Sequence, residues 1–377
     1  MVAFPSGGGG GTMKKFLIGG SPCTHWSIAQ SKNRETSAEG IGWELFRNYL
    51  IAKEKSKPDF FLYENNKSAA QAIKDQIAAE LEAPLQYINS ALVSAQNRQR
   101  FYAHNFGEVP LPEDRGIRLQ DILESGTSWL EKAYAYTTRC TGAIPSDTLK
   151  RKRHTMVAEH VIFEEENYPV INGAKVIVTE RAIRQGDRKG TKQGKYVYLP
   201  TAEKTNTISA GQAHNEKVIV SKPKGTWKTV YDVVNGEIKI DGEKYAINLP
   251  DGQYIIRKLT VTEAERLQTL PDGYTRAVSS AQAYKGIGNG WTAEVIIHLL
   301  SYALKDIPKD EEIIVLSMYD GIGTGRYCFD KLGYHNIKYY AYEIDKYAMQ
   351  IANSNYADII QCGDAFQVRE EGWEVEQ

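Results

Sequence analysis

Long apolar runs and paired cysteines are both missing from this sequence of 377 residues. No stretch approaches the roughly 20 consecutive apolar residues that a membrane helix needs, so we expect no membrane partner. The N-terminus lacks the basic, apolar and small-residue succession of a secretory signal. The cysteines have no CxxC spacing, which argues against a disulfide framework and a metal site and favours the reducing cytoplasm. There are four of them: Cys23, Cys140, Cys328 and Cys362.

Charge is nearly balanced overall but uneven along the chain. The net charge is −1, whereas residues 139–228 contain 17 lysines and arginines and 9 acidic residues. A basic region of this kind suits a polyanionic partner, although a solvated, loop-rich surface would have the same composition. Five consecutive glycines follow Ser6, so we expect residues 1–12 to be a flexible leader outside the folded protein.

Apolar runs alternate with helical spacing at both ends of the chain, which is typical of an α/β fold with a parallel sheet. The N-terminal part predicts strands at 16–18, 60–63, around Val93 and at 101–106, and helices at 42–55 and 68–81, the latter with Ser68 as its N-cap. The C-terminal part predicts helices at 262–270, 293–304 and 346–353 and strands at 313–318, 337–342 and 359–361.

The middle of the chain has a different pattern, in which turns separate short β-type pieces such as 175–178, 196–199 and 218–220. We therefore expect a second, smaller domain that is mixed or mostly β. The composition, with 42% hydrophobic and 25% charged residues, is that of a globular enzyme, and the length is sufficient for two domains.

Glycines follow the strand expected at 313–318, in the segment Tyr319-Asp320-Gly321-Ile322-Gly323-Thr324-Gly325. Glycines at a strand-to-helix turn let the backbone approach a ligand, and an acidic residue about 20 positions later can hold ribose hydroxyls. Glu343 has this position, and Asp364 follows the third strand. The pattern favours a nucleotide-type cofactor, although glycines at such turns often serve packing alone.

Cys23 follows the first N-terminal strand and Glu64 ends the next, which places both at the carboxyl edge where open α/β sheets have their active sites. Pro22 stiffens the approach to the thiol. Glu64 has the chemistry to hydrogen-bond a pyrimidine ring nitrogen. The alternatives are an inert buried cysteine and a carboxylate that only favours a helix N-terminus.

Arg98 and Arg100 occupy alternate positions, so on a strand both would point to one face. Two guanidinium groups there suit the planar recognition of a carbonyl, carboxylate or phosphate. Ordinary surface arginines are the equal alternative.

In their order, these motifs resemble those of the DNA (cytosine-5) methyltransferases across nearly the whole chain after Met13. Three of them resemble the family's catalytic motifs: Ser21-Pro22-Cys23 its proline-cysteine loop, Tyr63-Glu64-Asn65 its glutamate-asparagine motif and Gln96-x-Arg98-x-Arg100 its Gln-x-Arg-x-Arg motif. Three more resemble flanking motifs: residues 257–271 the segment that organises target recognition, 282–290 the glycine-asparagine motif and 319–325 the cofactor loop.

The resemblance implies transfer of a methyl group from S-adenosylmethionine to C5 of a cytosine flipped out of double-stranded DNA. Cys23 would attack C6, Glu64 would bond N3, and Arg98 and Arg100 would orient the base carbonyl. The residues implied at the DNA are Ser27, Gln96 and Asn65. The residues implied for the cofactor are Tyr319, Asp320, Gly321, Ile322, Gly323, Thr324, Glu343, Ile344, Asp364, Ala365, Asn289 and Trp291.

The order of the motifs is rotated relative to the family, because the cofactor half comes last. The resemblance therefore implies a Rossmann-like methyltransferase sheet that is circularly permuted, with Met13 near Gln377. The expected parts are residues 13–104 as the catalytic half, 105–256 as a target-recognition domain, 257–305 as a return to the catalytic domain and 306–377 as the cofactor-binding half. Tyr319 and Trp291 depart from the usual family residues, and with Asp320 and Thr324 they look more like the vertebrate de novo branch.

Two alternatives remain beside this interpretation. An RNA cytosine-5 methyltransferase acting on tRNA would share the chemistry, but the long insertion between Arg100 and Arg257 argues against it. A catalytically silent DNA-binding relative would lack at least one of Cys23, Glu64 and the two arginines. The absence of reader domains favours a monomeric enzyme of a bacterium or phage.

Overall fold

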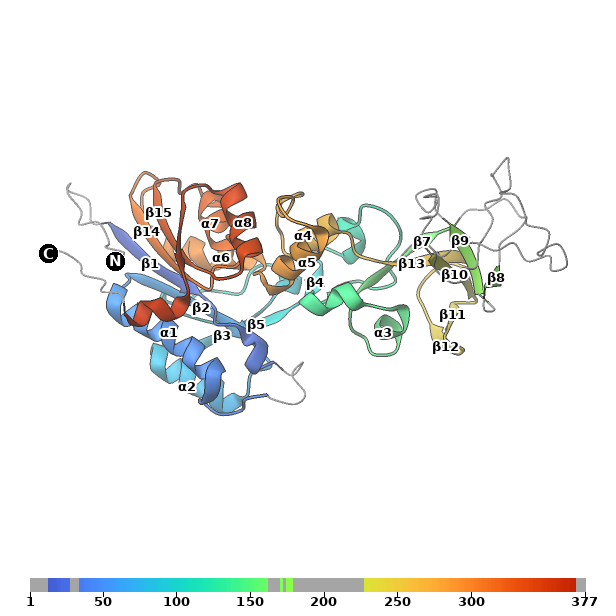
Figure 1. Cartoon of the computed structure of the whole chain (residues 1–377), viewed down its shortest axis with the longest axis horizontal. Helices are drawn as coiled ribbons and strands as arrows, with labels where there is room; N and C mark the ends of the chain where they lie inside the picture. The colour runs from blue at the N-terminus through green and yellow to red at the C-terminus, as the bar shows by residue number, and fades with distance from the viewer. Residues whose placement is uncertain (1–12, 28–33, 162–169, 172–173, 179–226, 371–377) are drawn as a thin grey trace, which may run out of the picture.

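The computed structural model describes the chain apart from residues 1–12, 28–33, 162–169, 172–173, 179–226 and 371–377 (Figure 1). A largely parallel sheet and a smaller antiparallel sheet, each of seven strands, lie at opposite ends of the described part, with short helices between them. The strands expected at 196–199 and 218–220 lie outside the described residues. Within the described part, no helix has the length and apolar character needed to cross a membrane.

The larger sheet joins the two ends of the chain, in the order β16-β15-β14-β1-β2-β5-β3. Its strands are β1 (Lys14–Gly19), β2 (Phe60–Asn66), β3 (Leu85–Asn89), β5 (Gln99–His104), β14 (Ile313–Met318), β15 (Ile337–Tyr342) and β16 (Ile359–Gly363). β5 is antiparallel to β2 and β3, and the other adjacent pairs are parallel. The expected α/β class with a largely parallel sheet is confirmed.

Helices cover both faces of this sheet because its central strands are apolar on both faces. α1 (Gly40–Ser56) and α2 (Gln71–Leu81) pack on one face, and α6 (Ala293–Ala303), α7 (Thr324–Lys331) and α8 (Lys346–Asn355) on the other (Figure 1). In β1, Phe16 and Ile18 pack in the core beneath α6, α7 and α8, whereas Leu17 packs in the core beneath α1 and α2. This alternation of buried side chains explains the unbroken apolar run that the sequence shows there.

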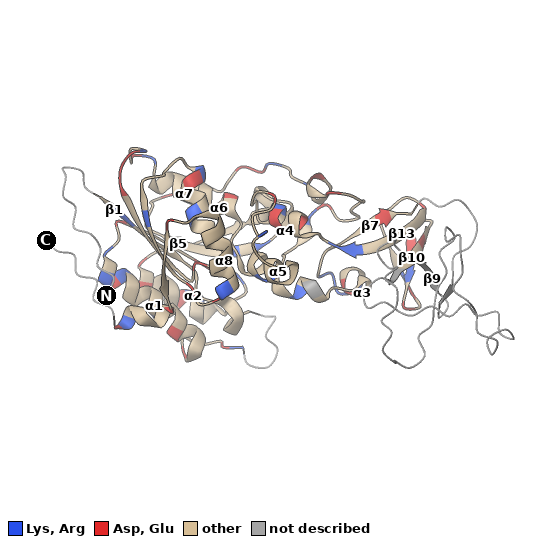
Figure 2. Ribbon diagram, turned by 45° about the horizontal axis from the view of Figure 1, so that its top comes forward, with Lys and Arg blue, Asp and Glu red and all other residues tan. Residues whose placement is uncertain are grey.

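The smaller sheet is antiparallel, in the order β12-β11-β10-β13-β7. Its strands are β7 (Met156–His160), β10 (Trp227–Val234), β11 (Glu237–Ile240), β12 (Glu243–Ala246) and β13 (Gly252–Lys258), and the pair β8 (Val170–Ile171) and β9 (Ala174–Val178) extends it. This agrees with the expected mostly β second domain. Acidic and basic positions lie side by side on β7 and β13 (Figure 2), where Glu159 accepts a 2.6 Å hydrogen bond from Arg257.

A third apolar cluster connects the two sheets. Leu259, Ala264 and Leu267, at and around α4 (Val261–Leu267), pack with Ile287 of α5 (Ser280–Asn289) and with residues from the segment 117–140. That segment was expected to belong to the second domain. Here it packs against α4 and α5, and the smaller sheet begins only at Met156.

Local predictions were wrong at three places. The helix expected from Ser68 begins at Gln71, with Ala70 at the N-cap position. Residues around Val93 form a 3-10 turn, Ser90–Leu92 (η2), that the Asn89 side chain caps, instead of a strand. The helix expected to reach residue 270 ends at Leu267, because Thr269 adopts the left-handed conformation with φ of 56°.

Candidate active site

The loop that carries Cys23 leaves the carboxyl end of β1 and passes directly beside Glu64. A Cβ atom at Gly20 would lie 2.5 Å from the Glu64 carbonyl oxygen and 3.0 Å from Glu64 Oε2, so only glycine fits there. Cys23 begins the 3-10 turn Cys23–His25 (η1) and is half-buried. The backbone N–H groups of Trp26 and Ser27 donate to its carbonyl oxygen. The loop that carries Cys23 and Ser27 therefore reaches Glu64 at one edge of the sheet, the edge that the sequence predicted for Cys23 and Glu64.

Asn65 holds this loop from behind. Its side-chain amide donates to the Ser21 carbonyl oxygen at 2.9 Å and to the Tyr63 hydroxyl at 3.0 Å, and Ser21 Oγ lies 2.7 Å from the same hydroxyl. Asn65 and Ser21 are both buried. Asn65 was expected to contact DNA, but the structure places its amide in the packing beneath the cysteine loop.

The Glu64 carboxylate is held at both oxygens. Arg100 Nε lies 2.9 Å from Oε1, and Trp291 Nε1 donates to Oε2 at 3.0 Å. The side chains of Glu64 and Arg100 are each only 12% exposed. Glu64 does not end its strand as expected, since β2 continues to Asn66. Trp291, expected among the cofactor residues, is thus also a direct partner of Glu64.

Arg98 and Gln96 lie deeper than Arg100. The Arg98 guanidinium donates to the carbonyl oxygens of Tyr136 and Gly290, at 2.7 and 2.8 Å. Burial and, to a lesser extent, the charge of Arg100 lower the pKa of Arg98 to about 10, against the opposite effect of the nearby Glu64 and Cys23. The buried Gln96 amide donates to the Leu267 carbonyl oxygen. These two side chains connect the catalytic edge to the segment 117–140 and to α4, whereas Gln96 was expected at the DNA.

A second candidate site lies at the carboxyl ends of β14 and β15. The Glu343 carboxylate accepts hydrogen bonds from the backbone N–H groups of Gly321, Ile344 and Asp345, each at 2.8 Å. A cavity of about 60 Å³ opens beside it. It is lined by Gln282, Lys285, Gly286, Asn289, Gly321, Glu343, Asp345, Tyr347 and Ala348. Three of these, Asn289, Gly321 and Glu343, were expected from the sequence.

Asp320, next in the chain to the cavity-lining Gly321, has an unpartnered carboxylate oxygen. Its Oδ1 accepts hydrogen bonds from Tyr339 and Ser317, at 2.6 and 2.7 Å, whereas its buried Oδ2 has no partner. Burial, together with the charge of Glu343, raises the pKa of Asp320 to about 6. The two hydrogen bonds act in the opposite direction. A Cβ atom at the adjacent Gly321 would meet nothing within 4 Å, so open space lies next to this acid.

The other expected cofactor residues that follow β14, β15 and β16 are not among those that line this cavity. The Tyr319 hydroxyl donates to the Leu45 carbonyl oxygen in α1, and Gly323 is the N-cap of α7, with φ of 78°. Ile322 and Thr324 are buried, and Ile344 is 71% exposed. Asp364 caps the turn Ala365–Arg369 (η7), in which Ala365 is buried. Sequence reasoning missed Lys285 and Asp345, whose side chains form a 2.5 Å ion pair at the cavity. The N-cap position of Asp345 before α8 was the available signal.

Comparison with known proteins decides the family. Residues 11–305 match the sequence profile of the C-5 cytosine-specific DNA methylases. The chain belongs to this family. The enzyme is therefore a DNA cytosine-5 methyltransferase, as its motifs indicated, and the match favours DNA over the RNA substrate considered above.

Two curated relatives of this methyltransferase are bacterial. Type II methyltransferase M.HpaII of Haemophilus parainfluenzae is 26% identical over 293 residues, which cover 72% of this chain and 67% of the relative. Type II methyltransferase M.Bpa9945I of Bacillus paralicheniformis is 24% identical over 327 residues, which cover 78% and 71%.

Among solved structures, the methyltransferase EhMeth of Entamoeba histolytica is similar with a TM-score of 0.37 and 13% identity, over 78% of both chains. The Dnmt2 methyltransferase of S. pombe has a TM-score of 0.36 and 12% identity, over 78% of this chain and 77% of that one. Scores this low add nothing to the assignment, which depends on the sequence profile.

Proposed function

We propose that the methyltransferase acts on a cytosine flipped out of duplex DNA, with Cys23 as the nucleophile and S-adenosylmethionine as the methyl donor. The observation that carries this proposal is the junction of the Cys23 loop with Glu64, where Gly20 leaves no room for a side chain between them. A nucleophile and a carboxyl group at one sheet edge are the pair that addition to a pyrimidine ring requires.

In the proposed reaction, the Cys23 thiolate adds to C6 of the cytosine, and the ring electrons move toward C5. Glu64 stabilises this change by hydrogen-bonding or protonating N3, and Arg100 orients the base carbonyl. When bound, S-adenosylmethionine supplies an electrophilic methyl group to C5. Loss of the C5 proton then restores the double bond and expels the Cys23 thiolate. Arg98, whose guanidinium is engaged by two backbone carbonyls, acts as a positioning residue for Arg100 and the Gly290 turn.

A mechanism-based trap tests this proposal directly. Duplex DNA carrying 5-fluorocytosine in place of cytosine has no C5 proton to lose, so the adduct persists after methyl transfer. We expect a covalent protein–DNA complex that forms only with S-adenosylmethionine and maps by peptide mass spectrometry to Cys23. An adduct at Cys362, the other half-buried cysteine, or no adduct on duplex DNA would contradict the proposal.

The residues around the second site fit S-adenosylmethionine. The unpartnered Asp320 Oδ2 is suited to a positively charged group, and the donor carries both an ammonium and a sulfonium. Glu343 directly follows β15, a position from which a carboxylate can accept hydrogen bonds from ribose hydroxyls. Asn289 lines the same cavity. Tyr319, Ile322, Gly323, Thr324, Ile344, Asp364, Ala365 and Trp291 complete the proposed cofactor set.

Replacing Glu343 with alanine is expected to weaken S-adenosylmethionine binding at least about tenfold. The change removes the proposed ribose acceptor and leaves the N–H groups of Gly321, Ile344 and Asp345 without their partner. Isothermal titration calorimetry measures the effect, with Glu312→Gln as a control, because Glu312 pairs with Lys338 away from the cavity. Unchanged affinity in Glu343→Ala would remove Glu343 from the cofactor site.

We also propose that Trp291 positions Glu64. Trp291→Phe keeps an aromatic ring but removes the N–H that holds Oε2. Hydrogen bonds to charged groups contribute roughly 1.5–3 kcal/mol, so a ten- to hundredfold slower methyl transfer in single turnover is expected. Cofactor affinity should stay within about twofold if the ring itself makes the cofactor contact. Trp43→Phe, in the α1 packing, is the matched control and should retain the wild-type rate. Equal rates in both variants would dismiss this role.

We also propose that the chain is a circular permutation of the family's usual order. The family profile ends at residue 305, and the three strands that precede most of the proposed cofactor residues come after it. Near the C-terminal end, Arg369 donates to Asn48 of α1 at 2.6 Å, so the last described turn packs beside the first helix. That proximity supports a family chain whose usual ends are joined and whose cut lies between β16 and β1. The smaller sheet and the basic residues before Arg257 would then recognise the DNA.

A further inference from the structure

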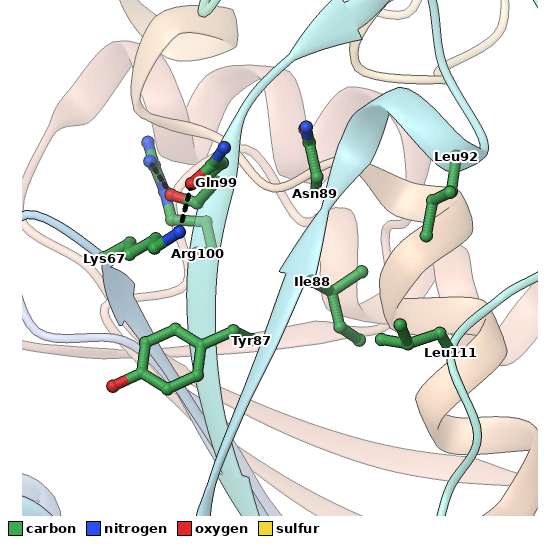
Figure 3. Close-up of a pocket in the computed structure, with 8 residues that line it drawn as sticks. All are labelled: Lys67, Tyr87, Ile88, Asn89, Leu92, Gln99, Arg100 and Leu111. Carbon is green, nitrogen blue, oxygen red and sulfur yellow. Dashed lines mark hydrogen bonds between the residues drawn. The ribbon is translucent and has the colours of Figure 1, made fainter.

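A cavity of about 230 Å³ lies at the β3 edge of the larger sheet, next to the proposed active site (Figure 3). It is lined by Lys67, Tyr87, Ile88, Asn89, Leu92, Gln99, Arg100 and Leu111. Arg100 belongs both to this cavity and to the ion pair with Glu64. The mechanism proposed above uses none of the other residues in this set.

The surface beside the cavity combines an exposed aromatic ring with two ammonium groups. Tyr87 is 41% exposed, and the Lys67 and Lys74 Nζ atoms lie 6.0 and 5.6 Å from the centre of its ring. Lys67 donates to Gln99 Oε1 and Lys74 to the Lys67 carbonyl oxygen, both of which are neutral acceptors. These hydrogen bonds therefore leave both positive charges uncompensated. We call Lys67, Lys74, Tyr87 and Gln99 the edge patch.

The edge patch lies on the side of the sheet that carries Cys23. β3 runs parallel to β1 and β2, because it is antiparallel to β5, which is itself antiparallel to β2. Its carboxyl end, Asn89, is therefore at the same edge as Cys23, and Lys67 directly follows β2. Three strand spacings separate β3 from β1, about 14 Å in all. Along B-DNA this distance corresponds to roughly four base pairs.

We propose that the edge patch binds the sugar–phosphate backbone of the duplex DNA substrate, within about four base pairs of the target cytosine. Lys67 and Lys74 contact phosphate oxygens, and the Tyr87 ring packs against a deoxyribose or an exposed base face. Lysine ammonium groups on flexible stems can leave Gln99 and reach a phosphate. The substrate is a polyanion, which matches the uncompensated charge. The inference uses the proposed position of the target base at Cys23.

The test compares DNA binding and turnover in the double variant Lys67→Gln/Lys74→Gln and in the wild type. We expect the KM for duplex DNA to rise about tenfold, with kcat at saturating DNA and cofactor affinity unchanged. The slope of log affinity against log salt concentration should become shallower by about 0.9 for each phosphate that the variant no longer neutralises. Lys305→Gln is the control, because Lys305 follows α6 in the chain that leads to the amino end of β14, opposite the carboxyl ends of the strands where the edge patch lies.

Tyr87 gives an independent measurement. Tyr87→Phe keeps the ring and should bind DNA as the wild type does, whereas Tyr87→Ala should weaken binding severalfold without lowering kcat. An unchanged salt slope in the double lysine variant, or a loss of kcat at unchanged DNA affinity, would overturn the edge patch as a DNA-binding surface. Either result would leave the 5-fluorocytosine adduct at Cys23 intact, so failure of this inference is distinguishable from failure of the proposed mechanism.

Discussion

DNA methylation is expected to disappear in Cys23→Ala, with S-adenosylmethionine binding retained. Without the thiolate, no covalent bond forms at C6, and C5 stays too electron-poor to accept a methyl cation. The measurement is conversion sequencing of total DNA from a bacterial host that lacks cytosine methylation and expresses either chain. Wild-type enzyme should protect cytosines within one short sequence, and the variant should protect none. The same experiment would reveal the recognition sequence.

The control for this experiment is Cys362→Ala, which removes a half-buried cysteine outside the proposed active site. It should protect the same cytosines as the wild type. Calorimetry with S-adenosylmethionine verifies that the Cys23→Ala protein is folded and binds its cofactor. Protected cytosines in Cys23→Ala cells would show that another group attacks the base, and the role of Cys23 would have to be abandoned.

The second large effect is expected at Glu64. Glu64→Gln keeps the shape of the side chain, but the amide cannot transfer a proton to N3, and Arg100 loses the charge that now lies 2.9 Å from its Nε. General acid–base catalysis contributes typically about 10²–10⁴-fold, so kcat should fall by a factor in this range. Turnover of duplex DNA with labelled S-adenosylmethionine measures it.

Glu294→Gln is the matched control for Glu64→Gln. Glu294 forms a 2.7 Å ion pair with Arg115 at a more exposed place, so this variant also breaks a glutamate–arginine ion pair. Its kcat should remain within about twofold of the wild type, because exposed ion pairs contribute little. A Glu64→Gln enzyme that turns over as fast as the control would show that the carboxyl group has no part in the chemistry.

The order of strands and helices could be predicted from the sequence because the apolar runs are unbroken and the turns between them are rich in glycine. β14, β15 and α8 lie almost where their patterns indicated. The errors came where a local side-chain hydrogen bond competed with the regular strand or helix that the pattern predicted. Asn89 caps a 3-10 turn before Val93, and Ser68 is followed by a helix that starts three residues later. Such choices depend on single side-chain hydrogen bonds, which periodicity does not reveal.

The candidate site divides in the same way. Cys23, Glu64 and Glu343 could be anticipated, because Cys23 and Glu343 follow strands and Glu64 lies near the end of one, where the carboxyl ends define the functional edge. Two hydrogen bonds join residues far apart in the sequence: the one from Trp291 to Glu64 and the one from Gln96 to Leu267. Neither partner carries a local signal of the other. The buried position of Asn65 likewise follows from the packing of the cysteine loop on β2.

The central position of β1 has a consequence for biosynthesis. Lys14 pairs with Ile313, so one side of β1 stays without its neighbour until the ribosome has made β14. At about 5–20 residues per second, that delay is roughly 15–60 s. During this time β1, with its apolar side chains, has unpaired backbone N–H and C=O groups along one side. Such an edge can pair with another chain, and chaperones would have to shield it. The proposed nucleophile is thus translated well before β14, the strand that completes one side of the sheet beneath its loop.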